Sequence, residues 1–150
     1  MLEELGCAIG KGLLSGLAGT AAITGAQRIE MRLTGRQPSS TPEKAGGAVL
    51  GVEPTNEAGK RFGTMVHWFY GTVWGIPLGL LRLSGLRKCM ANAVHFLAIW
   101  LTGMILLPAL KASSAPWKWG VKALAIDGLL HIVYAAASGL FHEWISPPRK

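Results

Sequence analysis

Long apolar segments, separated by clusters of charged residues, dominate the sequence. Two of them contain no Lys, Arg, Asp or Glu: 20 residues from Phe62 to Leu81 and 22 residues from Cys89 to Leu110. The hydrocarbon core of a bilayer is about 30 Å thick and is crossed by about 20 helical residues. Basic residues stand at both ends of each segment, where they can reach lipid headgroups. We therefore expect both segments to form transmembrane helices.

Two further segments are less regular. Residues 12–27 are uncharged but number only 16, and residues 123–141 include one acid, Asp127. The first segment crosses the bilayer only if the bilayer thins or if the charged side chains at the ends of the segment extend to the headgroups. The alternative is that this segment forms an interfacial helix. The alternative for the second is a helix buried in a soluble domain. We favour an all-α integral membrane bundle of four transmembrane helices, forming one domain over residues 1–150. The spans lie at roughly 10–28, 60–82, 89–110 and 120–142.

Proline and glycine indicate how the spans are connected. Gly35 predicts the end of the first helix, and a long polar loop follows over residues 36–54. Within this loop, Thr41 is predicted to cap a short helix over residues 42–50 that lies on the membrane surface. Pro77 lies inside the second span. It removes a backbone hydrogen bond and predicts a bend near Val73–Pro77.

Breaks are also predicted outside the spans. Pro54 precedes the second span, with Thr55 as its helix cap, and Pro147 and Pro148 follow the last span.

Composition and charge agree with a membrane protein. Half of the residues are hydrophobic, 15% are charged, and the mean hydropathy is +0.34. The formal charge of +7 comes from residues at span ends and in loops, which favours binding to anionic lipid. The basic residues form no dense cluster, so we expect no nucleic-acid partner.

Small residues recur at every fourth position on two of the spans. Gly71, Gly75 and Gly79 lie on the second span, and Gly12 and Gly16 lie on the first. Small residues at this spacing form a groove that lets two helix backbones approach closely. The groove is either a contact within the bundle or a face for self-association or a partner subunit.

Ionisable residues inside the spans are the candidates for chemistry, because they are costly in a membrane and usually face the bundle interior. They are His67, His95, Asp127 and His131. Asp127 and His131 are four residues apart and share one helix face. At about 1.5 Å per residue, His67, Asp127 and His131 lie roughly 8–14 Å below one membrane face. His95 enters from the other side and lies outside this layer, and His142 is expected to be solvated at a span end.

Several roles are open for this polar layer. A hydrogen bond from His67 or His131 to Asp127 would join the second and last spans. The same residues could titrate or relay protons. Two histidines and a carboxylate could bind a divalent metal, and His67 with His131 could ligate haem. No soluble-enzyme motif is present, so we expect neither catalytic residues nor a cofactor.

The layout resembles the YagU-like family of small bacterial inner-membrane proteins, whose biochemical function is not established. The segments that carry the resemblance are the loop at residues 37–42, the aromatic span at residues 66–71, the span at residues 93–96 that closes at Leu107-Pro108, and Pro116-Trp117 before a last span with Asp127 and His131. The resemblance implies a helical, multi-pass protein of the bacterial inner (cytoplasmic) membrane.

The expected function is therefore that of a non-enzymatic membrane protein. We expect it to act as a small subunit of a larger complex or as a homo-oligomer, with the lipid bilayer as its surroundings. The alternative is a proton- or metal-handling protein that works through His67, Asp127, His131 and, less directly, His95.

Overall fold

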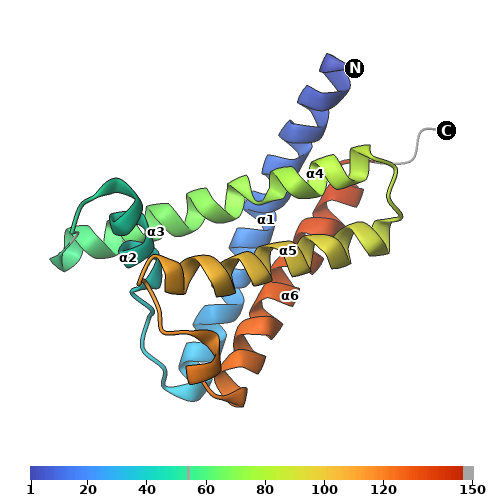
Figure 1. The fold of residues 1–150 in the computed structure, drawn as a ribbon. Coiled ribbons are helices and arrows are strands. Elements are labelled where there is room, and N and C mark those ends of the chain that lie inside the picture. The colour runs from blue at the N-terminus through green and yellow to red at the C-terminus, as the bar shows by residue number, and fades with distance from the viewer. Residues whose placement is uncertain (54, 147–150) are drawn as a thin grey trace.

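The computed structural model describes residues 1–53 and 55–146, and that part of the chain contains helices and no β-strand (Figure 1). Pro54 and residues 147–150, where the sequence predicts breaks, lie outside the described residues. The helices are α1 (Leu2–Thr34), α2 (Thr41–Leu50), α3 (Asn56–Val73), α4 (Gly75–Leu83), α5 (Lys88–Ala109), the 3-10 helix η1 (Pro116–Lys118) and α6 (Val121–Trp144).

The first helix ends where its sequence predicts. Gly35 has a φ of 70°, in the left-handed region that glycine adopts without steric cost. Its backbone N–H donates to the carbonyl of Met31 at 2.9 Å. This bond satisfies one of the carbonyls left free at the helix end, so α1 stops at Thr34.

The short helix α2 begins one residue earlier than expected. The cap is Ser40, and Thr41, which the sequence predicts as the cap, is already helical. The Ser39 hydroxyl donates to the Thr41 hydroxyl at 2.8 Å, and the Thr41 backbone N–H donates to the Ser39 hydroxyl at 3.2 Å. Thr41 is therefore held by the turn before it, a local arrangement that hydroxyl side chains often form.

The second predicted span is two helices. α3 ends at Val73, Trp74 is a turn residue, and α4 begins at Gly75. Pro77 has no N–H to donate to the Val73 carbonyl, which weakens the helix at this place. The interruption falls where the sequence predicts a bend, at Val73–Pro77. Thr55 is the N-cap residue of α3, as expected, but its side chain makes no capping hydrogen bond.

Three helices are long and apolar enough to cross a membrane by length and composition: α1, α5 and α6. α3 does not join them, because it begins with Glu57, Lys60 and Arg61 and ends at the interruption. The described residues thus form an all-helical structure with three candidate membrane-spanning helices, one fewer than the sequence predicts.

The glycines of α1 and α4 face each other inside the molecule. A Cβ atom added at Gly12 would lie 2.6 Å from the Gly75 carbonyl oxygen, and one added at Gly75 would collide with the Gly12 carbonyl oxygen. Added atoms at Gly16 and Gly79 would likewise collide with the opposite backbone, at Thr72 and Ala8. The two backbones are therefore in direct contact, which only residues without a side chain permit.

α1 also packs along α6, while α3–α4 and α5 cross this pair (Figure 1). The small residue at this contact is Gly19, where an added Cβ would collide with the Ser138 hydroxyl and lie 2.8 Å from the Tyr134 ring. The core that joins α1, α5 and α6 consists of Ile23, Ile99, Leu130 and Tyr134.

The molecule has two different ends. End A carries α2 and the connection from α5 to α6, and end B carries the start of α1, the turn from α4 to α5 and the end of α6 (Figure 1). Charged side chains join the helices at end B. Arg82 of α4 donates to Glu143 of α6 at 3.0 Å and to Asn92 of α5 at 3.1 Å, and Lys88 lies 3.3 Å from Glu143.

His142 at end B is buried, with 6% of its surface exposed, so the prediction that it is solvated was wrong. Ala135, Ser138 and Gly139 are also buried, and His142 lies four residues beyond Ser138. Residues four apart share a helix face, so the face of α6 that packs on its neighbours extends to His142.

Candidate functional site

His67 projects from α3 and contacts α1 through Thr24. The Thr24 hydroxyl donates to the Thr20 carbonyl oxygen at 2.6 Å and lies 3.1 Å from His67 Nε2. Because the hydroxyl hydrogen is already used, the hydroxyl oxygen accepts from His67 Nε2–H. The neutral ring then carries its free lone pair on Nδ1. His67 is therefore a link between α3 and α1 and does not contact Asp127.

Asp127 and His131 lie on one face of α6, as their spacing predicts. Asp127 Oδ2 accepts a hydrogen bond from the indole N–H of Trp100 on α5 at 2.9 Å. His131 Nδ1 lies 2.8 Å from the Asp127 carbonyl oxygen and 3.6 Å from Asp127 Oδ2. Since a carbonyl oxygen only accepts, Nδ1 of His131 carries a hydrogen, and in the neutral form of the ring Nε2 holds the lone pair. The acid thus joins α6 to α5, a contact that the sequence did not predict.

His95 occupies a separate place, as its depth predicts. It is fully buried, and its Nε2 donates to the Trp74 carbonyl oxygen at 2.8 Å. Its ring lies 5.6 Å from that of Tyr134, whose hydroxyl donates to the Gly71 carbonyl oxygen at 2.6 Å. Both bonds reach the backbone beside the interruption at Trp74, where they hold the end of α3 against α5 and α6.

A cavity of about 1130 Å³ lies between these helices. His67, Asp127 and His131 line it, and His95 does not. Its walls come from α1, α2, α3, α5 and α6, and no residue of α4 takes part. Most of the lining is apolar, for example Phe62 on α3 and Ile99 on α5. The three residues of the predicted polar layer therefore face one common space and do not form one bonded cluster.

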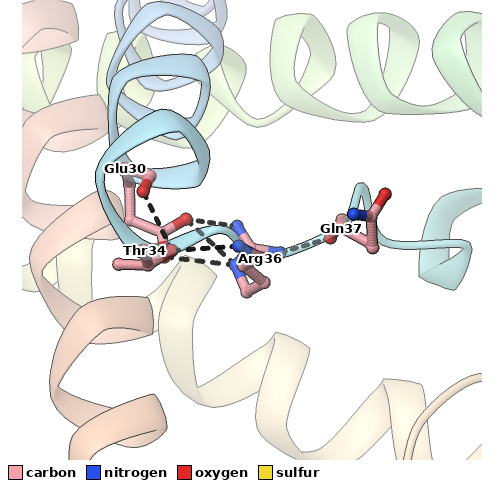
Figure 2. Close-up of polar contacts among 4 residues, drawn as sticks. All are labelled: Glu30, Thr34, Arg36 and Gln37. Carbon is pink, nitrogen blue, oxygen red and sulfur yellow. Dashed lines mark hydrogen bonds and ion pairs between the residues drawn. The ribbon is translucent and has the colours of Figure 1, made fainter.

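The cavity reaches end A, where the Arg36 guanidinium donates several hydrogen bonds to the Glu30 carboxylate (Figure 2). Arg36 Nη2 lies 2.6 Å from Glu30 Oε2, and Arg36 Nε lies 2.9 Å from the same oxygen. The Thr34 hydroxyl donates to Glu30 Oε1 at 3.0 Å. Glu30 lies past the apolar segment of α1, and its hydrogen bonds with the Arg36 guanidinium lower the pKa of its carboxyl group. This contact folds the chain back across the end of α1.

The side-chain positions do not support a metal site in the described residues. Across residues 1–53 and 55–146, no three His, Cys, Asp or Glu side chains gather closely enough to hold a metal ion. His67 and Asp127 instead bond to Thr24 and Trp100.

Sequence reasoning missed Tyr134 and Trp100 as partners of the polar layer. One signal was available for Tyr134. Asp127, His131, Tyr134 and Ser138 follow one another at intervals of four, three and four residues, which places them on one face of α6. Trp100 had no comparable signal, because its contact depends on how α5 and α6 dock.

No protein-family model, curated protein or solved structure matches this chain significantly. The function is therefore argued from the fold and the cavity alone.

Proposed function

We propose that this protein is a non-enzymatic component of a bacterial cytoplasmic membrane that crosses the bilayer four times. α3 and α4 together supply the fourth span, since residues 62–81 between them carry no charged side chain. An interrupted helix is tolerated at membrane depth when other helices satisfy its backbone. His95 and Tyr134 bond to carbonyls at this interruption, which supports the proposal. The resemblance to YagU-like proteins is part of the proposal and implies the same membrane.

The observation that carries the proposal is an uncovered apolar stripe on α5. Its large side chains are between 40% and 73% exposed and recur every three or four residues: Met90, Val94, Leu97, Leu101 and Ile105. A stripe of this kind on a membrane-length helix faces lipid or another transmembrane helix. The glycines of α1 and α4 are already used inside the molecule. We therefore assign any contact with a partner subunit or a second copy to α5.

The test compares the oligomeric mass of purified protein in mild detergent with that of an α5 variant. In a homo-oligomer, Leu97→Gln with Leu101→Gln lowers the mass to that of the monomer, because the polar side chains disrupt packing on this face. Leu129→Gln is the matched control, since Leu129 is 61% exposed on α6. If the α5 substitutions leave the oligomeric mass at its wild-type value, the assignment of the subunit contact to α5 is wrong.

A second candidate function, proton handling, has its own supporting observation. His67 and His131 each use one ring nitrogen within the protein and line the same cavity as Asp127. Within the described ranges, the other nitrogen of each ring has no hydrogen-bond partner, so each can accept a proton. Histidine NMR in detergent tests this: Asp127→Asn should change the titration of His131 and leave that of His142 unchanged. If His131 titrates identically in both proteins, proton coupling through Asp127 is wrong.

A further inference from the structure

We propose that the cavity binds one acyl chain of an anionic membrane lipid, with the lipid headgroup at end A beside Lys122. This inference goes beyond the proposed function, because it assigns a ligand to the cavity. It rests on the depth of the cavity, on the chemistry of its walls and on the charge at its rim.

The depth matches that of one leaflet. Along α6, the lining runs from Lys122 at end A to Tyr134 in the core. Twelve residues of α-helix rise about 18 Å. One leaflet contributes half of a hydrocarbon core of about 30 Å, so an acyl chain entering from the membrane surface reaches a similar depth. A compact polar ligand would leave most of this length unfilled.

The walls suit a hydrocarbon chain. Deep in the cavity, Ile99 and Leu130 line it on α5 and α6. Asp127 and His67 lie between them and the rim, and each is already hydrogen-bonded inside the protein. A chain can therefore pass these groups without breaking the bonds of Asp127 to Trp100 and of His67 to Thr24, and its contact with the apolar wall is favourable. At about 1130 Å³, the cavity also slightly exceeds the range of small-molecule pockets, which is about 300–1,000 Å³.

The rim supplies an unneutralised positive charge. Arg36 is neutralised by Glu30, but Lys122 is exposed and forms no ion pair with any residue in the described ranges. Trp119 lines the cavity close to Lys122 in sequence, and tryptophan favours the headgroup region. A lysine at this level attracts anionic headgroups. The combination favours an anionic phospholipid over a zwitterionic one.

The first experiment blocks the cavity. A Cβ added at Gly103, which lines the cavity on α5, meets no atom within 4 Å, so Gly103→Phe places its ring there without a backbone clash. Gly10→Phe is the matched control, because Gly10 is equally open but does not line the cavity. Purified proteins are exchanged into phosphatidylglycerol nanodiscs, released, and analysed by native mass spectrometry. We expect a retained lipid on the wild type and on Gly10→Phe, and its loss from Gly103→Phe.

The second experiment tests the headgroup and does not depend on the first variant folding. Wild type, Lys122→Gln and Lys118→Gln are compared in equal mixtures of phosphatidylglycerol and phosphatidylcholine with identical chains. Lys118 is a matched control, because it is exposed nearby but does not line the cavity. Lys122→Gln should lower the preference for phosphatidylglycerol roughly fivefold. Equal retention of both lipids by the wild type, no retained lipid, or a second protein copy in place of lipid would each overturn the proposal.

Discussion

The Tyr134 hydroxyl is the polar group that fixes the end of α3 against α6. Tyr134 is 1% exposed, and its bond to the Gly71 carbonyl oxygen, at 2.6 Å, joins residues 63 positions apart in the sequence. With little water available at this depth, each buried polar group depends on a partner in the protein. Tyr134 therefore contributes to stability through one identifiable bond.

Tyr134→Phe removes this bond and keeps the ring. We expect the free energy of unfolding in detergent to fall by about 1–3 kcal/mol, because a buried acceptor loses its donor. Tyr70→Phe is the control, since Tyr70 is 37% exposed and its loss of a hydroxyl leaves no deeply buried group without a partner. Equal stability of the two variants would contradict the assigned role of the Tyr134 hydroxyl.

The contact of Glu30 with Arg36 should depend on pH. The pKa of Glu30 is lower in the folded protein than in the unfolded chain, because Arg36 donates to the ionised carboxylate. The stabilisation is therefore present above the unfolded pKa of Glu30 and is lost as the pH falls through its folded pKa. Thermal unfolding of the wild type and of Glu30→Gln, measured from neutral to acidic pH, checks this. The stability difference between them should shrink on acidification, and a difference that grows would show that the assigned linkage is wrong.

At the scale of elements, the contact between α1 and α4 sets the shape of the bundle. Gly12 and Gly75 place backbone against backbone, so the space for a side chain at either position is absent. Gly75 and Gly79 lie on α4, but Gly71 lies on α3, where an added Cβ would collide with the Thr20 hydroxyl. Of these two helices only α3 lines the cavity, so α4 packs on α1 and α3 both packs on α1 and borders the cavity.

Gly75→Leu should disrupt the fold of the bundle, because its side chain would collide with the α1 backbone at Gly12 and Gly16. We expect a large loss of thermal stability and aggregation in detergent. Gly10→Leu, at an open position of α1, should behave like the wild type. A Gly75→Leu protein with unchanged thermal stability would show that the glycine contact is absent in the membrane.

At the scale of the whole molecule, the arrangement of ends fits the four-span topology that we propose. Cys7 near the start of α1 and Cys89 near the start of α5 are both exposed and both belong to end B. Ser39 and Ser113 belong to end A, in the loops after α1 and α5. A membrane between the two ends would separate these pairs.

Labelling with a membrane-impermeant thiol reagent tests the topology. In single-cysteine proteins, Cys7 and Cys89 should react from one side of the membrane. Ser39→Cys and Ser113→Cys, placed in a protein without the native cysteines, should react from the other side. Reaction of Ser39→Cys and Cys89 from the same side would contradict four spans.

The sequence by itself determined the helices, because their signals are local. The uncharged run 89–110 predicted α5, the run 123–141 with its single acid predicted α6, and Gly35 predicted the end of α1. Pro77 predicted a bend in the region where the structure has the interruption at Trp74. Spacing also placed Asp127 and His131 on one helix face. These features depend on backbone geometry and on the free energy of transferring an apolar segment from water into lipid. Both are set by the residues of a single segment.

Only the tertiary structure decided which polar residues meet. The sequence suggested that His67 or His131 bonds to Asp127, but the Asp127 carboxylate bonds to Trp100 and His67 bonds to Thr24. The sequence also left the place of the glycine contact open, and the structure puts it between α1 and the end of α3 together with α4. The cavity had no sequence signal. These outcomes depend on how helices distant in sequence dock and rotate against each other. The periodicity of one helix shows which residues share a face, but it does not show which other helix that face contacts.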